Sequence, residues 1–395
     1  MATGQYIGVN GVARKVTTPY IGVNGVARNV TSGYVGVNGV ARLFFVPTPT
    51  GPIILEVEKI TSNTYANDTT YNNEEFILLD IYPKTGGTVS VTYGGLAKTI
   101  TDTSGAEKPN AQEVFFGTFN GVSDSVTTPS SGELTIEGDY RAFSVGTYAK
   151  SSKSSSNPCG CITAVTDFGS IAVLPNDAFN SCASIVSLII PDGVTSIGLG
   201  AFTSCTGLKS LTIPKSVRSI GAYNASASIS NDDTFSGCAA LKDIFVDEAN
   251  EHYDVEGGAL FNKDKSCLIA YPAVSGGYTI PNTVTEIWEC AFSGTALTSV
   301  TIPEGVTSID DAAFYDCTGL TSLTIPSTVT KIGGLAFYGC NGLLEITILA
   351  TTPPTLDGSS VFPTDAPIYV PAGCGDTYKA ADGWSTYANY IVEAS

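Results

Sequence analysis

The chain has 395 residues with 42 glycines, 20 prolines and only 14% charged side chains, a composition that favours β-structure with many tight turns and more than one domain. Its formal net charge is -18, and because phosphate contacts need clustered cations, we expect no nucleic-acid binding by the bulk of the protein. The sequence does not open with a basic segment followed by an apolar one, and no apolar run approaches about 18 residues, so we expect no signal peptide and no membrane insertion.

The first 46 residues carry a short repeat that predicts β-hairpins. The sequence Tyr-Ile-Gly-Val-Asn-Gly-Val-Ala-Arg starts at Tyr6 and recurs from Tyr20 and from Tyr34. An Asn-Gly pair between short apolar runs favours a type I′ turn, because both central residues of that turn need positive φ. We therefore predict three hairpins, which turn at Asn10-Gly11, Asn24-Gly25 and Asn38-Gly39.

This repeat resembles one in the N-terminal segments of predicted virion proteins from phages and prophages of Gram-positive gut bacteria. The resemblance implies that residues 1–46 attach the protein to a particle. The first 50 residues hold four cations and no acid, which suits docking on an acidic protein surface; solvated arginines in an array without a partner are the alternative. The candidate virion-attachment residues are the tyrosine and the arginine of each copy: Tyr6, Arg14, Tyr20, Arg28, Tyr34 and Arg42.

Residues 47–150 are predicted to form a β-sandwich that acts as a spacer. A Pro-Thr linker at residues 47–52 is followed by strand-like runs at residues 53–60, 75–81, 89–100, 113–119 and 133–149. Because no segment has helical periodicity, we expect an immunoglobulin-like sandwich, which here would lack cysteine and therefore an inter-sheet disulfide. The Ser-rich residues 151–158 are predicted to be a linker.

Residues 159–395 repeat a unit of about 23 residues, which predicts a solenoid. In the unit that begins at Cys317, Leu323 and Ile325 alternate with polar residues, a pattern typical of a short strand with one buried face. Pro326 ends this strand because it has no amide proton to donate. Phe337 is expected to fill the core, and since one turn cannot bury its own apolar face, the turns must stack.

The same features mark the other units. Each strand ends at an Ile-Pro pair, at residues 190–191, 213–214, 280–281, 302–303 and 325–326. The predicted core aromatic residues are Phe179, Phe202, Phe235, Phe292, Phe314 and Phe337. Two irregular segments, 222–233 and 247–273, interrupt the array, and such positions in a solenoid usually carry a loop or a hairpin.

The region from residue 162 onward resembles the BspA-like leucine-rich repeats of bacterial surface proteins and some gut-phage proteins. The resemblance includes the irregular Leu260-Phe261-Asn-Lys-Asp unit and the C-terminal ending. It implies a ligand-binding or adhesive scaffold and not a catalyst. In the ending we expect a short helix capped by Asp376 and a core closed by Tyr378, Trp384, Tyr387 and Ile391.

The titratable side chains form no recognisable catalytic or metal-binding motif. His252, the only histidine, has no nucleophile motif beside it. The adjacent carboxylates Asp232-Asp233 and Asp310-Asp311 would point to opposite faces of an extended chain, which is poor for shared acid–base chemistry. We therefore predict a protein that is not an enzyme and has no cofactor and no metal.

Cysteines recur three residues after several of the core phenylalanines. Because equivalent positions stack, we expect a ladder of buried, reduced thiols made by Cys182, Cys205, Cys238, Cys317 and Cys340. For Cys159 and Cys161 the sequence leaves both a mutual disulfide and free thiols open.

The outward positions of the repeated strands are the candidate ligand face. Small hydroxyl side chains recur there and should line up across the sheet, so the face could contact a glycan or a protein; a solvated sheet face is the alternative. Tyr315 and Tyr338, beside the core residues, are alternative contact points. The candidate face residues are Ser210, Thr212, Phe245, Ser299, Thr301, Ser322, Thr324 and Thr347.

The sequence thus predicts a mainly β protein with N-terminal hairpin repeats, an immunoglobulin-like sandwich and a leucine-rich-repeat solenoid with a short capping helix. We expect a phage virion structural protein of the tail fibre or baseplate, assembled in the host cytoplasm and released by lysis. Its N-terminal repeats would contact other virion proteins and its solenoid a host cell-surface protein or glycan, in a homo-oligomer such as a trimer. The alternatives are a capsid-surface decoration or head fibre protein and a bacterial cell-surface adhesin.

Overall fold

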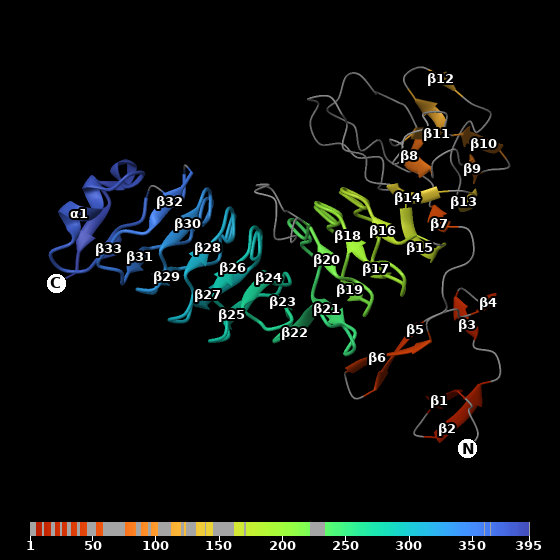
Figure 1. Cartoon of the computed structure of the whole chain (residues 1–395), viewed down its shortest axis with the longest axis horizontal. Helices are drawn as coiled ribbons and strands as arrows, with labels where there is room; N and C mark the ends of the chain where they lie inside the picture. Colours follow the sequence, from red (N-terminus) through yellow and green to blue (C-terminus); the bar gives the residue numbers. More distant parts are fainter. Residues whose placement is uncertain are drawn as a thin grey trace. The chain divides into compact units, whose positions relative to one another are not determined.

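The computed structural model describes residues 171–394, except 222–233, 359 and 364, together with residues 88–93, 96–101, 164, 165, 168 and 169; further strands before residue 169 are described by their backbone alone. The chain divides into two compact units, Met1–Thr48 and Pro49–Ser395. Figure 1 shows the elements of both units.

The unit Met1–Thr48 contains three antiparallel strand pairs, one for each copy of the N-terminal repeat. The pairs are β1 (Gln5–Val9) with β2 (Val12–Val16), β3 (Tyr20–Val23) with β4 (Val26–Asn29), and β5 (Gly33–Val37) with β6 (Val40–Phe45). The predicted Asn-Gly turns lie outside the described residues, so the hairpins stay a prediction.

Two antiparallel sheets open the unit Pro49–Ser395. The first has the order β10 (Leu96–Thr101), β9 (Thr88–Tyr93), β13 (Gly132–Gly138), β7 (Ile53–Val57) and β15 (Ile162–Phe168). The second has the order β12 (Val122–Ser123), β11 (Gln112–Phe119), β8 (Phe76–Pro83) and β14 (Tyr140–Ser144). The predicted run 89–100 corresponds to the two strands β9 and β10, and the run 133–149 to β13 and β14. An immunoglobulin-like arrangement stays a prediction.

The first sheet and the first solenoid turns share one hydrophobic core. Strand β15 pairs with β7, and its last residue, Phe168, packs edge to face on Phe179 with a centroid separation of 6.2 Å. Val89 and Val91 of β9 belong to the same buried cluster as Leu174. Strand β15 lies in the region predicted to be solenoid, and its sheet covers apolar side chains that the first turn cannot bury alone.

The solenoid contributes one strand per regular turn to each of two rows. The first row, here called the long-strand row, comprises three sheets: β17 (Ser187–Ile189), β19 (Ser210–Ile213) and β21 (Asp243–Val246); β25 (Gly276–Thr279) and β27 (Leu297–Thr301); and β29 (Ser322–Ile325), β31 (Glu345–Ile348), β33 (Ile368–Val370) and β34 (Ile391–Glu393). Its strands are parallel (Figure 1).

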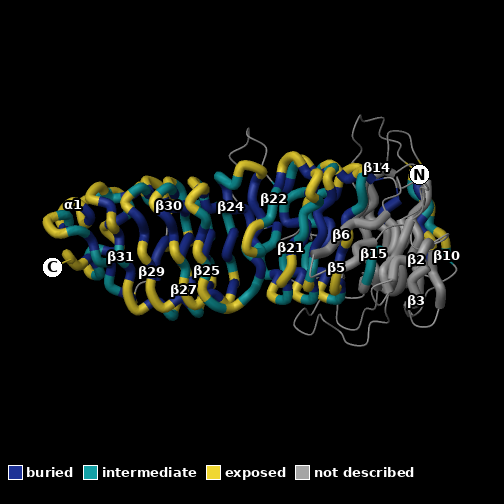
Figure 2. The backbone as a smooth tube through the Cα atoms, turned by 90° about the horizontal axis from the view of Figure 1, so that it is seen from below, coloured by how far each residue is buried: buried dark blue, intermediate teal, exposed yellow. Residues whose placement is uncertain are grey.

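The second row, here called the short-strand row, comprises two sheets: β16 (Val173–Leu174), β18 (Ser196–Ile197) and β20 (Ser219–Ile220); and β22 (Tyr253–Glu256), β23 (Ala259–Asn262), β24 (Cys267–Ala270), β26 (Glu286–Ile287), β28 (Ser308–Ile309), β30 (Lys331–Gly333) and β32 (Thr355–Asp357). The irregular segment 247–273 supplies the antiparallel strands β22, β23 and β24, so it continues the sheet as a hairpin does. Figure 2 shows buried and exposed segments alternating around each turn.

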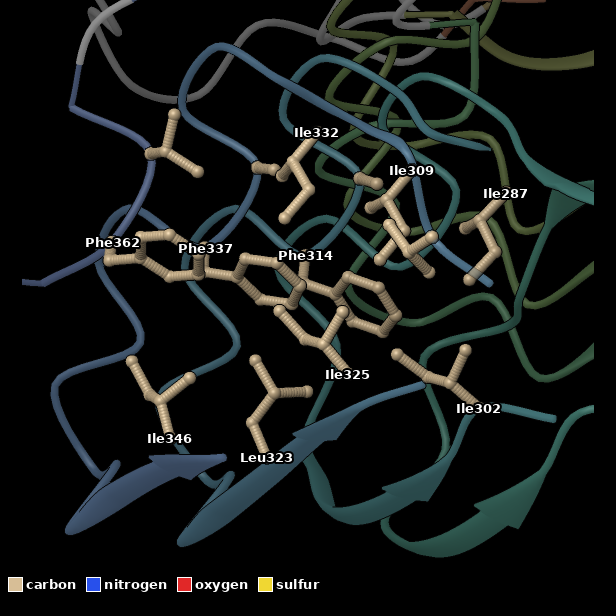
Figure 3. Close-up of a cluster of buried hydrophobic side chains, with 14 of the residues drawn as sticks. Ile287, Ile302, Ile309, Phe314, Leu323, Ile325, Ile332, Phe337, Ile346 and Phe362 are labelled. Atoms are coloured by element: carbon tan, nitrogen blue, oxygen red, sulfur yellow. The ribbon is translucent and has the colours of Figure 1, made fainter. Parts of the chain in front are cut away.

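The predicted alternation within one turn is confirmed in β29. Leu323 and Ile325 are buried, whereas Ser322 and Thr324 are exposed. Leu323 lies in register with Ile346 of the next turn, so the inward side chains of neighbouring strands pack on each other (Figure 3). The alternating pattern therefore determines which side chains of the strand are buried and which residues of the next turn they contact.

A column of aromatic rings fills the core (Figure 3). Phe314 stacks on Phe292 with a centroid separation of 4.7 Å and on Phe337 with one of 5.1 Å. Two members of the column were not predicted. Phe362 stacks on Phe337 at 5.6 Å, and Tyr271 takes the place of a phenylalanine in the irregular turn, where its amide donates to the Ala291 carbonyl at 2.7 Å.

The C-terminal end is closed as expected, except at the helix start. Trp384 donates through Nε1 to the Pro354 carbonyl at 2.8 Å, and the Tyr378 hydroxyl donates to the Ala350 carbonyl at 2.7 Å. Helix α1 (Gly375–Ala380) is followed by the 3₁₀ helix η2 (Trp384–Tyr387). The prediction that Asp376 caps α1 was wrong. Asp376 lies within the first turn of the helix, and the Glu393 carboxylate accepts the Gly373 and Gly375 amides instead.

The aromatic column predicts a large energetic difference between two adjacent residues. Phe337→Ala should lower the free energy of unfolding by about 3–5 kcal/mol, because it removes a fully buried ring and leaves a cavity. Tyr338→Ala, one residue away and 45% exposed, should cost less than about 1.5 kcal/mol. Urea denaturation followed by circular dichroism measures both free energies of unfolding. Equal losses in the two variants would contradict the stabilising role of the aromatic column.

Candidate functional site

The candidate ligand face lies on the long-strand row, and its C-terminal part is open to solvent. Ser299 and Thr301 on β27 and Ser322 and Thr324 on β29 are exposed. Thr347 on β31 is half-buried. These strands belong to consecutive turns of the repeat. The alternation within each strand predicts that their hydroxyl side chains point outward.

Thr212 does not belong to the exposed face. Its relative exposure is 6%, although it occupies the same repeat position as Thr324. In the sheet register Thr212 lies between Ile189 of β17 and Phe245 of β21, two side chains much larger than its own. The neighbouring Ser210 and Phe245 are only half-buried.

The face is not one continuous sheet. Strand β27 pairs with β25 and β29 pairs with β31, and the two pairs belong to separate sheets. Within the second of these sheets, the row Thr324, Thr347 continues to Tyr369 of β33 and to the exposed Val392 of β34. The sequence reasoning missed these last two, because β33 and β34 lie beyond the regular repeat.

The candidate attachment residues Tyr6, Arg14, Tyr20, Arg28, Tyr34 and Arg42 lie on β1 to β6, whose backbone alone is described. Their role stays a prediction.

The buried cysteines form the expected ladder, with one correction. The thiol of Cys205 donates to the Phe179 carbonyl at 2.9 Å, and the thiol of Cys340 donates to the Phe314 carbonyl at 3.1 Å. Cys238 and Cys317 make the same contact with the phenylalanine of the preceding turn. Each of these four cysteines is reduced, as predicted.

The prediction that Cys182 is reduced was wrong. Cys182 is disulfide-bonded, and its partner lies outside the described residues. It belongs to the first turn of the ladder. In another turn Thr295 takes the place of the cysteine, with its Oγ1 3.4 Å from the sulfur of Cys317.

The surroundings of three buried thiols raise their pKa values. The hydrogen bond with Cys238 and burial raise the pKa of Cys205, and Cys317 and burial raise the pKa of Cys340 in the same way. Burial also raises the pKa of Cys267. The hydrogen bond with Cys340 instead lowers the pKa of Cys317, with burial opposing it. Since the thiolate is the nucleophile, the raised pKa values favour the protonated, less reactive form of Cys205, Cys267 and Cys340.

The carboxylate pair on the short-strand row does not converge on a reaction centre. Asp310 accepts the Ser308 hydroxyl at 2.7 Å, whereas Asp311 accepts the Gly334 amide of the next turn. Burial, and then the neighbouring Asp310, raise the pKa of Glu286. Asp232 and Asp233 lie outside the described residues. Within the described part of the chain, no three His, Cys, Asp or Glu side chains are grouped so that they could hold a metal ion.

His252 is held by its backbone. Its amide and that of Tyr253 both donate to the Asn250 side-chain oxygen at 2.8 Å, while the Asn250 amide nitrogen donates to the Pro214 and Val217 carbonyls. The buried Asn250 thus fastens the irregular segment to the preceding turn.

Among the helices that the structure describes, none has the length and apolar character needed to cross a bilayer.

The stacked turns, the two strand rows and the aromatic column define a leucine-rich-repeat solenoid. Residues 159–262 and 277–359 match the BspA type leucine-rich repeat region in six copies. No curated protein is significantly similar to the chain in sequence.

Several solved structures are similar to this chain. A leucine-rich repeat protein from Eubacterium ventriosum is 24% identical and has a TM-score of 0.38, and the match covers 52% of this chain and 67% of that one. The pneumococcal vaccine antigen PcpA is 18% identical with a TM-score of 0.35, over 57% and 72% of the two chains. A leucine-rich cell surface protein from Faecalibacterium prausnitzii is 23% identical with a TM-score of 0.36, over 57% and 64%. At these identities and TM-scores the likenesses carry no argument about function.

The thiol ladder predicts selective alkylation. In the folded protein, iodoacetamide at about pH 8 should modify the half-buried Cys374 and leave Cys205 and Cys340 unmodified, because their raised pKa values keep them protonated. Peptide mass spectrometry measures the sites, and all three should react once urea unfolds the chain. Equal reaction rates in the folded protein would contradict the ladder.

Proposed function

We propose that this protein is a surface-displayed binding protein of a phage virion, whose solenoid recognises a host cell-surface protein or glycan. The observation that carries the proposal is the set of exposed hydroxyl side chains on two consecutive strands of the long-strand row, Ser299 and Thr301 on β27 and Ser322 and Thr324 on β29. A rigid row of this kind can align with the repeating hydroxyl and amide groups of a glycan or with an extended protein segment. The BspA type repeats support a binding scaffold, because such solenoids present long surfaces and enclose no reaction chamber.

The N-terminal repeats support attachment to a particle. They are basic and contain no acid, whereas the whole chain has a net charge of -18, so the two ends of the protein suit different partners. In this proposal the repeats form hairpins, the two antiparallel sheets form an immunoglobulin-like spacer, and the protein is a homo-oligomer of a tail fibre or baseplate. A capsid-surface position is the second location.

The virion role has a direct test. Gold-labelled antibodies against residues 171–394 should decorate purified phage particles at the tail, and deletion of residues 1–46 should yield particles without this protein. Decoration of the bacterial cell surface in the absence of phage would instead favour an adhesin. Particles that keep the truncated protein would refute the attachment role of the repeats.

The binding face is tested with the full chain on an array of host glycans and surface proteins. Replacing Thr301 and Thr324 together by alanine should reduce binding roughly tenfold, because each lost hydroxyl removes about 0.5–1.5 kcal/mol of hydrogen bonding. The matched control replaces Thr206 and Thr318, two exposed threonines at corners of the turns, and should bind like the wild type. Unchanged binding by the first variant would rule the face out.

A further inference from the structure

The last sheet of the long-strand row carries an outward row whose chemistry changes from one strand to the next. The sheet has the order β29, β31, β33 and β34 (Figure 1). Thr324, Thr347, Tyr369 and Val392, one from each strand, lie in register across it and are here called the threonine–tyrosine row. This row begins with two hydroxyl side chains and ends with an aromatic ring and an apolar side chain.

Tyr369 places an aromatic ring on the outer face of this sheet. Its neighbours along β33, Ile368 and Val370, are buried, whereas Tyr369 is only half-buried. Because successive side chains of a strand point to opposite faces, the Tyr369 ring lies on the same outer face as the Thr347 hydroxyl. Val392, on the other side of the ring, is 42% exposed, so this end of the row is open to solvent.

A row that combines hydroxyl groups with an aromatic ring matches the two surfaces of a sugar. The edge of a pyranose ring carries hydroxyl groups, which exchange hydrogen bonds with threonine hydroxyls because both are donors and acceptors. The flat side of the pyranose ring carries C–H bonds with a slight positive charge, which lie favourably on the negative face of an aromatic ring. Thr324 and Thr347 supply the first kind of contact and Tyr369 supplies the second.

The length of the row suits a chain of sugars. Neighbouring strands lie about 4.8 Å apart, so the four positions of the row span on the order of 14 Å. A single sugar would contact only one or two of these positions. A chain of several sugars that follows the stacking direction would contact both threonines and the tyrosine at once.

A peptide is a poorer match for the same row. An extended peptide binds a sheet mainly by adding a strand at an edge, where backbone groups are unpaired. Strands β31 and β33 are paired on both sides, so the face above them offers side chains only. The large side chains that dominate protein interfaces bind in enclosed pockets, which a row of short hydroxyl side chains does not provide.

The row itself is uncharged. None of its four side chains is a cation that could pair with the phosphate, sulfate or carboxylate of an acidic glycan. The exposed Glu345 lies beside the row, in register with Ser322, and its carboxylate can accept hydrogen bonds from sugar hydroxyls. The ligand that fits this chemistry is therefore a neutral glycan.

We propose that the threonine–tyrosine row binds a neutral oligosaccharide of pyranose sugars, with one sugar ring stacked on Tyr369. The inference rests on the proposed function and narrows its ligand from a host protein or glycan to a neutral glycan. It assigns the aromatic contact to Tyr369, a residue beyond the regular repeat, and the hydroxyl contacts to Thr324 and Thr347.

The test uses the full chain with β-1,4-linked hexasaccharides of glucose and of N-acetylglucosamine, and isothermal titration calorimetry measures the binding. At least one of these sugars should bind the wild type. Tyr369→Leu should weaken that binding about three- to tenfold, because leucine keeps apolar volume but removes the ring face. Tyr369→Phe, which keeps the ring, should bind within about twofold of the wild type.

Two further variants locate the site. Thr347→Val removes a hydroxyl group but keeps the branched shape that a strand favours, so it should fold and should weaken binding about threefold. Tyr338→Leu is the matched control, because it removes an exposed tyrosine ring that lies outside the threonine–tyrosine row. It should change binding less than about twofold. Circular dichroism during urea denaturation shows that each variant is folded.

Three outcomes would overturn the proposal: neither hexasaccharide binds, Tyr369→Leu binds as tightly as the wild type, or Tyr338→Leu weakens binding as much as Tyr369→Leu does. Failure of the proposed function gives different results. If the array identifies a host protein whose binding requires Thr301 and Thr324 while neither hexasaccharide binds, the hydroxyl face stands and the glycan inference fails. If a hexasaccharide binds through Tyr369 but the antibodies find no protein on phage particles, the glycan site stands and the virion role fails.

Discussion

The solenoid depends on the burial of each turn's core side chains by the turns on either side. Phe314 has no exposed surface because Phe292 and Phe337 cover its two faces. The backbone conformation of each corner also depends on the next turn. Ala312 has a left-handed φ of 52°, which costs about 1–2 kcal/mol. Its amide donates to the Gly334 carbonyl of the next turn at 2.8 Å, and this hydrogen bond offsets part of that cost. A single turn would have neither its core nor its corner. The array must therefore be covered at both ends, by β15 with its sheet and by Trp384 with its neighbours.

The parts of the fold that follow from local pattern could be predicted from the sequence. The alternation around Leu323 indicates which side chains are buried, and Pro326 indicates where the strand ends, because both are properties of a few consecutive residues. Tyr271 could not be found in this way. The irregular segment has a tyrosine where the regular turns have the phenylalanine of the Ala-Phe pair, and only the structure shows that Tyr271 occupies the aromatic column, through its ring contact with Phe292 at 5.1 Å and the hydrogen bond from its amide to Ala291.

The candidate site was predicted less well, because exposure depends on residues in other turns. Thr212 and Thr324 have the same position in the repeat, but Thr212 lies between Ile189 and Phe245 and is buried. Cys182 has the repeat position of Cys205 but is disulfide-bonded, which the local pattern does not indicate. At helix α1 the amides of Gly373 and Gly375 are bound by Glu393, 18 residues beyond Gly375, so a local capping rule could not identify the acceptor.

The repeat also determines what kind of surface the solenoid can offer. Any outward position recurs once per turn, so its side chains form a row parallel to the stacking direction, and a row suits an extended ligand better than a compact one. Because the inward side chains form the core, the outward positions can change their chemistry without loss of that core. One scaffold can therefore present surfaces of different chemistry on the same turns.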